Sequence, residues 1–378
     1  MADKTFLKKT IIPLIVIDMI VLAIIFSVSG IYNDKVDTSI YVSQINQFEQ
    51  GSFPLENSKA ALRFFKPFYG VVGSWFTPLL SPYTFILLIN IFFLFALTIL
   101  SFFLFKEIIA DDRLAFWGAI WVAAGYPMLK YGIALGTDIS GWFFAVATVL
   151  AVLIGARENR TRCFVLASLL GFLGALAKEN GVLGLIFGGV YLLAHIGLWD
   201  FKKIIKAMAY LSVPFFALYG FFIFLMSWLG FPTFFDWYAL NLSSYAREYY
   251  KLFYFLGVEL SSFHVILFFG LIGIYYIVKR KDFFNRKWLA IFLGLFMSSL
   301  PVLAWPIFIS RILYVQFLIF VPLALYGVYH FSLSGANKKI LGLKLSDIML
   351  FMPIIASVAL FLLSGTDSLF EALKNLLN

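Results

Sequence analysis

The chain has 378 residues, of which 62% are hydrophobic and only 13% are charged, whereas a soluble domain averages about 45–50% apolar and about 25% charged residues. This composition excludes a water-soluble core of this size. The single cysteine, Cys163, excludes a disulfide framework, and three histidines leave little for a histidine-based metal site. The net charge of +9 does not require a nucleic-acid partner, because Lys and Arg concentrate at the cytoplasmic edges of membrane proteins.

Apolar runs of about 20 residues, the length that crosses a bilayer as a helix, recur along the whole chain. They predict an all-α, polytopic membrane protein that forms a single transmembrane domain over residues 1–378. About eleven spans are expected, at 11–29, 84–105, 114–131, 139–156, 163–178, 181–199, 207–229, 260–278, 288–305, 312–332 and 345–364. Between the fifth and sixth runs, the polar sequence Lys178-Glu179-Asn180-Gly181 predicts a tight hairpin turn.

The first apolar run follows two lysines and ends in small residues, a pattern that also fits a cleavable signal peptide. Asp18 within the run, and the many spans that follow it, favour a retained helix. A lone acid in a span is expected to face another helix or to be protonated.

The basic residues predict the orientation in the membrane. About two-thirds of the 29 Lys and Arg residues fall on connections that share a side with the N-terminus. The positive-inside rule therefore predicts a cytoplasmic N-terminus and, after eleven spans, an extracytoplasmic C-terminus. We expect the protein to lie in a bacterial plasma membrane.

Two outer connections, 30–83 and 230–259, are much longer than the cytoplasmic ones, so function is expected on the outer side. In the first, apolar residues at three- and four-residue steps, among them Tyr41 and Ile45, predict an amphipathic helix on the membrane surface that begins near Asp37. Asp37 is equally compatible with a capping role at the start of this helix. The second segment, 230–259, is dense in Tyr, Trp and Phe, which fits either a mobile lid or an interfacial aromatic belt.

The first outer segment continues with Arg63 and Lys66 among aromatic residues. Interruption by Pro67, Gly70 and Gly73 predicts a second interfacial helix rather than a span. The two cations either extend to lipid headgroups or bind the phosphate of a lipid substrate.

Three further outer connections carry a charged residue close to the hydrocarbon part of the membrane. Asp138 follows the third span, Lys178 lies in the hairpin turn, and Arg311 precedes the tenth span. Such charges cost a few kcal/mol unless they are paired or hydrated. Pairing of Lys178 with Glu179 or Asp138 would account for one of these features, but several on one side predict a polar cavity that opens outward.

The order of these elements resembles the GT-C superfamily of integral-membrane glycosyltransferases, and in particular the branch of the aminoarabinose transferases and protein O-mannosyltransferases. The matching elements, in chain order, are Asp37 with Tyr41, Lys66-Pro67-Phe68-Tyr69, Pro127 with Asp138, Leu176-Ala177-Lys178, and Arg311. The chain departs from the family pattern in two places: Lys-Pro-Phe replaces Lys-Pro-Pro, and Lys-Glu-Asn-Gly replaces Lys-Gly-Pro. Asp34 is a competing acid in the first outer segment.

The resemblance implies a GT-C-like fold and transfer of a sugar from a polyprenyl-phosphate or dolichyl-phosphate carrier to a lipid, glycan or protein acceptor. Under it, Asp37 is the expected general base and Asp138 positions the acceptor, with inversion at the anomeric carbon. The carrier would be bound by Lys66, Arg63, Lys178, Arg311, Tyr41 and Tyr69. A divalent cation, Mg²⁺ or Mn²⁺, would be held by Asp37 and Asp138.

Two other classes of protein remain open on the sequence. A secondary transporter should show two related halves, and no convincing repeat is found. A non-catalytic lipid-binding or assembly subunit would carry the same spans and the same outer cations.

Overall fold

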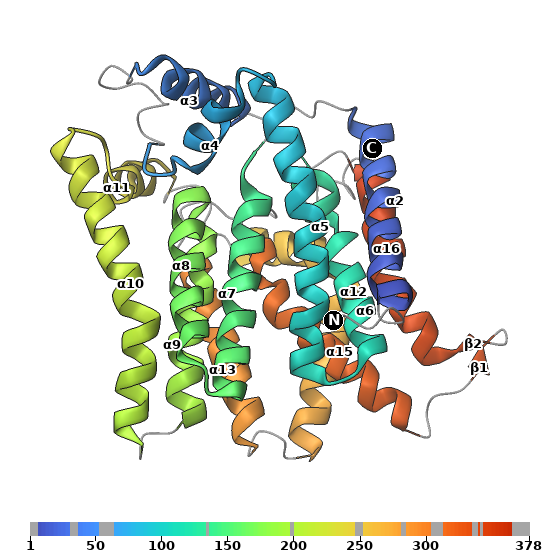
Figure 1. The fold of residues 1–378 in the computed structure, drawn as a ribbon. Helices are drawn as coiled ribbons and strands as arrows, with labels where there is room; N and C mark the ends of the chain where they lie inside the picture. The colour runs from blue at the N-terminus through green and yellow to red at the C-terminus, as the bar shows by residue number, and fades with distance from the viewer. Residues whose placement is uncertain are drawn as a thin grey trace.

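The chain forms a bundle of helices (Figure 1), seen here in a computed structural model. The structure describes residues 7–30, 37–52, 64–133, 136–196, 200–245, 252–280, 285–303, 313–334, 339–340 and 343–364. Arg63, Arg311 and Asp34 lie outside these residues.

The helices follow the apolar runs closely. They are η1 (Leu7–Ile11), α2 (Ile12–Ser29), α3 (Thr38–Gln50), α4 (Phe68–Phe76), α5 (Pro82–Ile109), α6 (Asp112–Ala123), η3 (Met128–Gly132), α7 (Asp138–Glu158), α8 (Thr161–Ala177), η4 (Glu179–Val182), α9 (Leu183–Ile196), α10 (Phe201–Trp228), α11 (Phe234–Tyr245), α12 (Leu252–Arg280), α13 (Arg286–Leu303), η6 (Tyr314–Gln316), α15 (Phe317–Leu333) and α16 (Leu345–Ser364). A minimal antiparallel hairpin, β1 (Lys339–Ile340) with β2 (Leu343–Lys344), precedes α16.

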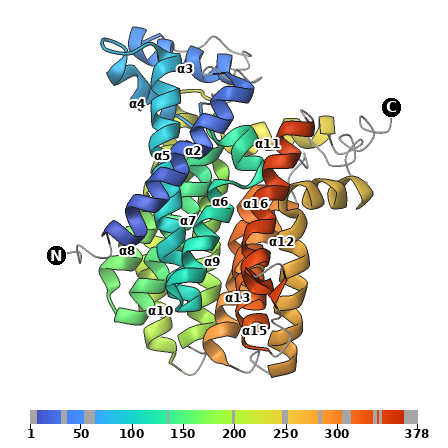
Figure 2. The same ribbon diagram turned by 90° about the vertical axis from the view of Figure 1, so that its right-hand side faces the viewer.

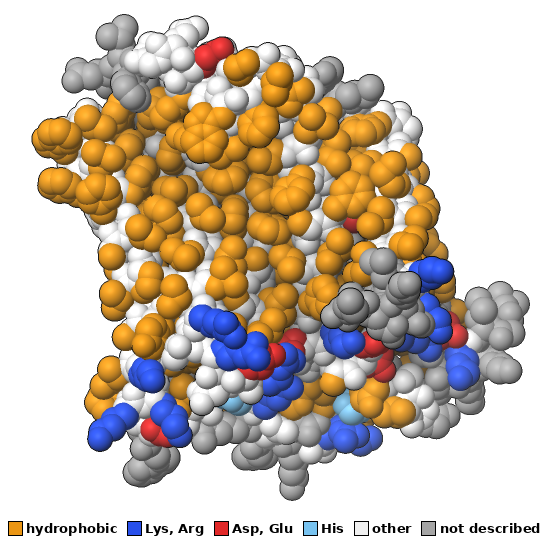
Figure 3. Space-filling view, viewed as in Figure 1, with side chains coloured by type: hydrophobic (Ala, Val, Ile, Leu, Met, Phe, Trp, Pro, Cys, Tyr) orange, Lys and Arg blue, Asp and Glu red, His pale blue; other side chains and the backbone are white. Residues whose placement is uncertain are grey.

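The predicted all-α, multi-pass membrane architecture is confirmed. Within the described residues, eight helical segments are long and apolar enough to cross a membrane, and α8 and α13 are shorter apolar helices. The expected number of eleven spans is not confirmed. Hydrophobic side chains cover the body of the face in Figure 3, and Lys and Arg gather along its lower edge.

Local sequence signals start several of these helices. Ser81 accepts a hydrogen bond from the backbone N–H of Thr84 and is followed by Pro82 at the first helical position of α5. The Asp111 carboxylate accepts one from Leu114 N–H at 2.8 Å and so caps α6. Each cap satisfies a backbone donor that would otherwise be unpaired at the helix start.

The predicted third span, 114–131, is divided in two. Helix α6 ends at Ala123, and the chain resumes as the π-helix η3 after Pro127. The Tyr314 hydroxyl donates to the Val122 carbonyl at 2.6 Å, which satisfies an acceptor that a continuing helix would have bonded. A Cβ at Gly125 would come within 2.1 Å of that hydroxyl oxygen, so Gly125 makes room for Tyr314.

The first long outer segment forms the two predicted helices, α3 and α4, which lie across one end of the bundle (Figure 1). Gly70 and Gly73 let α4 approach α3 closely, because a Cβ at either position would clash with Phe48 or Ile45. Helix α5 lies between α6 and α7, α9 packs on α13, and α12 packs on α15. At the last contact, a Cβ on Gly273 would come within 2.0 Å of the Leu323 carbonyl oxygen, so backbone meets backbone as in many membrane helix pairs.

Asp18 faces a neighbouring helix, as expected of an acid within a span. Its carboxylate is fully buried and accepts a hydrogen bond from Thr98 Oγ1 of α5 at 2.9 Å. This contact joins the first helix to the rest of the bundle.

Candidate functional site

Three glycines let the turn between α8 and α9 pack closely on α7 and α8. A Cβ at Gly181 would lie 2.5 Å from the Gly174 Cα, and a Cβ at Gly141 of α7 would lie 2.9 Å from the Lys178 Cβ. Real Cβ atoms do not approach this closely, so only glycine permits the packing. The polar turn therefore enters the bundle instead of extending into solvent, and the predicted tight hairpin is confirmed.

Lys178, in this turn, lies between the carboxylates of Asp138 and Glu179. Its Nζ is 3.1 Å from Asp138 Oδ1 and 3.8 Å from Glu179 Oε1. The side chains of Lys178 and Asp138 are 5% and 4% exposed. Asp138 is the first residue of α7. The predicted pairing of Lys178 is thus found, with both acids at once.

Lys66 reaches the same turn from the first outer segment. Its Nζ lies 2.7 Å from Glu179 Oε2, and its side chain is fully buried. Lys66, Glu179, Lys178 and Asp138 therefore form a chain of alternating charge with no net charge. Burying such groups is favourable only when each charge has a partner.

Aromatic rings from both outer segments lie beside Lys66. Its ammonium lies 5.0 Å from the centre of the Phe65 ring and 5.5 Å from that of Trp237 in α11, both within cation–π range. Phe234 of α11 packs against Phe65 edge to face, with ring centres 5.6 Å apart. Helix α11 therefore packs directly on the Lys66 segment.

A layer of tyrosines connects this charge network to α3, α4 and α5. Tyr69 donates to the side chain of Asn90 at 2.8 Å, and Asn90 in turn donates to the Gly136 carbonyl at 3.1 Å. Thr137 donates to the Tyr41 hydroxyl at 2.9 Å. Burial raises the pKa of the Tyr69 hydroxyl well above its usual range, so it remains a neutral hydrogen-bond donor.

Asp37 lies beside this layer, immediately before α3. It is buried, with 5% of its surface exposed, and its carboxylate makes no capping hydrogen bond to the helix. Capping therefore does not account for this acid. Asp37 is one turn before Tyr41, whose hydroxyl contacts the residue that precedes Asp138. The fold thus brings the two segments that carry the predicted catalytic acids together.

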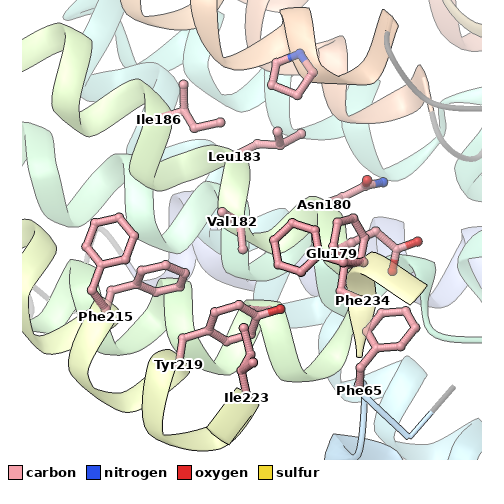
Figure 4. A pocket seen from close by; sticks show the side chains of 15 residues that line it. Phe65, Glu179, Asn180, Val182, Leu183, Ile186, Phe215, Tyr219, Ile223 and Phe234 are labelled. Carbon is pink, nitrogen blue, oxygen red and sulfur yellow. The ribbon is translucent and has the colours of Figure 1, made fainter. Parts of the chain in front are cut away.

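An apolar cavity of about 460 Å³ opens next to Glu179 (Figure 4). Glu179 and Asn180 lie at one end of it with Phe65 and Phe234, and Phe215, Ile186 and Leu183 line the rest. Its walls come from the α8–α9 hairpin, α10, α11, α13 and the Lys66 segment. The cavity is therefore apolar except at the end formed by Glu179 and Asn180.

The structure brings together most of the predicted site residues. Lys66, Lys178 and Asp138 belong to one network, Tyr41 and Tyr69 lie in the adjacent layer, and Arg63 and Arg311 lie outside the described residues.

Sequence reasoning missed three residues of the site. The sequence predicts Glu179 only as a partner of Lys178, and in the structure it also binds Lys66. Asn90 and Trp237 were not singled out. A lone amide within the apolar run of α5 is a signal that could have pointed to Asn90, since an unpaired amide in a span is costly.

The residues present do not fit a metal ion well. Among the described residues, no group of three His, Cys, Asp or Glu side chains is arranged to hold one. Asp138 is bound by the Lys178 ammonium, which occupies the position that a cation would take. The expectation of Mg²⁺ or Mn²⁺ at Asp37 and Asp138 remains an untested prediction.

The fold is similar to that of solved archaeal oligosaccharyltransferases. AglB from Archaeoglobus fulgidus, in complex with an inhibitory peptide and a dolichol-phosphate, superimposes with a TM-score of 0.56 and 14% identity over 94% of this chain. The apo oligosaccharyltransferase of the same organism gives a TM-score of 0.53 and 13% identity over 98% of this chain. These neighbours are GT-C glycosyltransferases. The chain shares the fold of these neighbours over 94% and 98% of its length.

This likeness covers 56% of each of those two neighbours' own length, so the chain spans little more than half of them. The predicted branch of aminoarabinose transferases and O-mannosyltransferases is not confirmed. No family model matches the sequence, and no curated protein matches it.

Proposed function

We propose that this protein transfers a sugar from a polyprenyl-phosphate or dolichyl-phosphate carrier to a lipid, glycan or protein acceptor. The observation that carries the proposal is that two buried cations, Lys66 and Lys178, both contact Glu179, which lines the polar end of an apolar cavity. A lipid-linked sugar has the same division into an anionic phosphate and a long apolar chain. The solved neighbours support the proposal, since one was captured with a dolichol-phosphate and another was tethered to an acceptor peptide.

The carrier would lie with its prenyl chain in the cavity and its phosphate at the two lysines. Phe215, Ile186 and Leu183 provide apolar contacts for the chain. The phosphate would displace Glu179 from Lys66 and Lys178, because its oxygens and the Glu179 carboxylate compete for the same two ammonium groups. Arg63 and Arg311 are the further cations proposed for this phosphate.

In the reaction, an acceptor oxygen or nitrogen attacks the anomeric carbon of the sugar. The bond from that carbon to the phosphate oxygen breaks, and its electron pair leaves with the carrier phosphate. Lys66 and Lys178 stabilise the negative charge that develops there, in a buried site where such contacts are strong. A single displacement inverts the anomeric configuration.

Asp37 would accept the proton that the acceptor loses. It is buried, makes no helix cap, and lies in the segment that contacts the start of α7. Asp138 would position the acceptor and hold Lys178 in place at 3.1 Å. Tyr41 and Tyr69 would line the route between these acids and the carrier phosphate.

We place the site on the extracytoplasmic side. It lies at the end of the bundle that α3 and α4 cross, whereas Lys and Arg gather at the opposite end (Figures 1 and 3). Under the positive-inside rule the basic end is cytoplasmic. Figure 2 shows α16 rising toward the end where α3 lies, which supports an extracytoplasmic C-terminus. A bacterial plasma membrane remains the proposed location.

The test is sugar release from defined carriers. Membranes containing the protein are supplied with a panel of polyprenyl- and dolichyl-phosphate sugars carrying a radioactive sugar, and label is followed into lipid, glycan and protein fractions. We expect transfer from at least one donor, with release of the carrier phosphate, and its loss in Lys66→Gln. Lys130→Gln, which removes an equal charge from a lysine outside the network, is the control.

Two outcomes would contradict the proposal. Binding of the carrier without transfer from any donor would indicate a non-catalytic lipid-binding protein. Movement of a free solute into liposomes, without consumption of carrier-linked sugar, would indicate a transporter.

A further inference from the structure

A second groove lies at the basic end of the bundle, away from the candidate active site. It has a volume of about 590 Å³ and is lined by α5, α7 and the start of α13. Its charged residues are Lys106, Glu107, Arg157 and Lys287, and its apolar residues are Phe103, Ala110, Leu150 and Ile154. Nothing in the proposed transfer reaction uses this groove.

The lining changes from apolar to basic along the helix axes. On α7, Leu150, Ile154 and Arg157 follow one another at steps of four and three residues, so they share one face. On α5, Phe103 is one turn before Lys106 and Glu107. The groove therefore has an apolar wall about 6 Å long, just over one helical turn, that leads to a basic end.

The charge of the groove favours an anion. Three cations and one carboxylate line it; Arg157 pairs with that carboxylate, Glu107, and also with Glu158, which leaves Lys106 and Lys287 as the other positive charges of the lining. Lys106 pairs with Asp112 outside the lining, through side chains that are 42% and 63% exposed. An exposed pair of this kind is weak, so Lys106 can turn toward a second anion at little cost.

We propose that this groove binds an anionic phospholipid of the membrane leaflet at the basic end. The phosphate headgroup contacts Lys106, Arg157 and Lys287, and an acyl chain lies along Phe103, Leu150 and Ile154. A soluble phosphate or a nucleic acid would leave the apolar wall unused, whereas a phospholipid matches both parts of the groove. Basic pockets between spans are the usual sites for such headgroups.

The groove is separate from the carrier site. Asp138 begins α7 in the charge network and Arg157 lies near its end, 19 residues later, which corresponds to about 28 Å of helix. A lipid in the groove would link α13 to α5 and α7 at the end of the bundle opposite α3 and α4.

The test is lipid retention by the full chain. Protein purified from vesicles of equal parts phosphatidylglycerol and phosphatidylcholine is analysed by native mass spectrometry. We expect selective retention of phosphatidylglycerol, reduced at least about tenfold in the double variant Lys106→Gln with Lys287→Gln. The control is Lys202→Gln with Lys206→Gln, which removes the same charge from the exposed start of α10 and should retain the lipid.

Two further measurements separate the contribution of the acyl chain from that of the phosphate headgroup. Ile154→Trp fills the apolar wall without changing charge and should also reduce retention, with thermal unfolding confirming that the variant folds. An excess of glycerol phosphate should not displace the lipid. The proposal would be overturned by equal retention of both lipids or by equal losses in the two double variants. It would also be overturned if Ile154→Trp had no effect or if glycerol phosphate displaced the lipid.

Discussion

The Glu179 carboxylate binds Lys66 at 2.7 Å, although 113 residues separate them in the chain. The same side chain lies 3.8 Å from Lys178. Glu179 therefore holds together the two cations proposed to bind a phosphate. Its position makes it a competitor of the carrier phosphate.

Replacing Glu179 with Gln should have opposite effects on stability and on carrier binding. The variant leaves the buried Lys66 ammonium without its acid, so the free energy of unfolding should fall by up to about 3–5 kcal/mol. Affinity for polyprenyl phosphate should rise by about tenfold, since the phosphate no longer competes with a carboxylate. Thermal unfolding with and without polyprenyl phosphate measures both effects, with Glu158→Gln at the far end of α7 as control. Weaker carrier binding in Glu179→Gln would contradict competition between Glu179 and the phosphate.

Replacing Lys66 with Gln should reduce both carrier binding and transfer. A donor that stabilises developing charge in a buried site typically contributes about 10²–10³ in rate. Carrier binding is measured by retention of labelled polyprenyl phosphate, and rate by label transfer. Retention of wild-type rate in a folded Lys66→Gln protein would remove this lysine from the mechanism.

Asp37→Asn and Asp138→Asn should differ in the step that they impair. Loss of a general base reduces the rate by about 10²–10⁴, so Asp37→Asn should lower kcat and leave carrier binding unchanged. Asp138→Asn removes the carboxylate that holds Lys178 in place, so the misplaced lysine should also weaken carrier binding. Single-turnover transfer and equilibrium binding separate the two. Full transfer activity in Asp37→Asn would refute the general-base assignment.

Gly181→Ala should destabilise the turn that carries Lys178 and Glu179. The added methyl would lie 2.5 Å from the Gly174 Cα, a backbone atom that cannot move aside alone. Overpacking of this kind costs about 1–3 kcal/mol. Gly189→Ala is the matched control, because its Cβ would meet only Met208, at 3.6 Å. Equal melting temperatures for the two variants would contradict the packing of this turn.

Chelation of divalent cations should leave transfer unchanged, because Lys178 already neutralises Asp138. Transfer is measured after EDTA treatment and after addition of Mg²⁺ or Mn²⁺. Loss of activity that either ion restores would instead support the sequence-based metal prediction at Asp37 and Asp138.

The sequence by itself determined the membrane class, most helix positions and several site residues. Apolar run length is a local property, and a bilayer demands about 20 such residues whatever the fold, so α5, α7 and α10 could be predicted closely. Lys66, Lys178 and Asp138 could be chosen because unpaired charge near bilayer depth is costly anywhere in the chain.

Only the tertiary structure decided which charges meet and where helices stop. Where α6 ends at Ala123, the Val122 carbonyl is bonded by Tyr314, nearly two hundred residues later. The pairing of Lys66 with Glu179 depends on glycine contacts that let the α8–α9 turn enter the bundle. Such contacts join segments that are distant in the chain. The spacing of apolar residues along one segment carries no information about them.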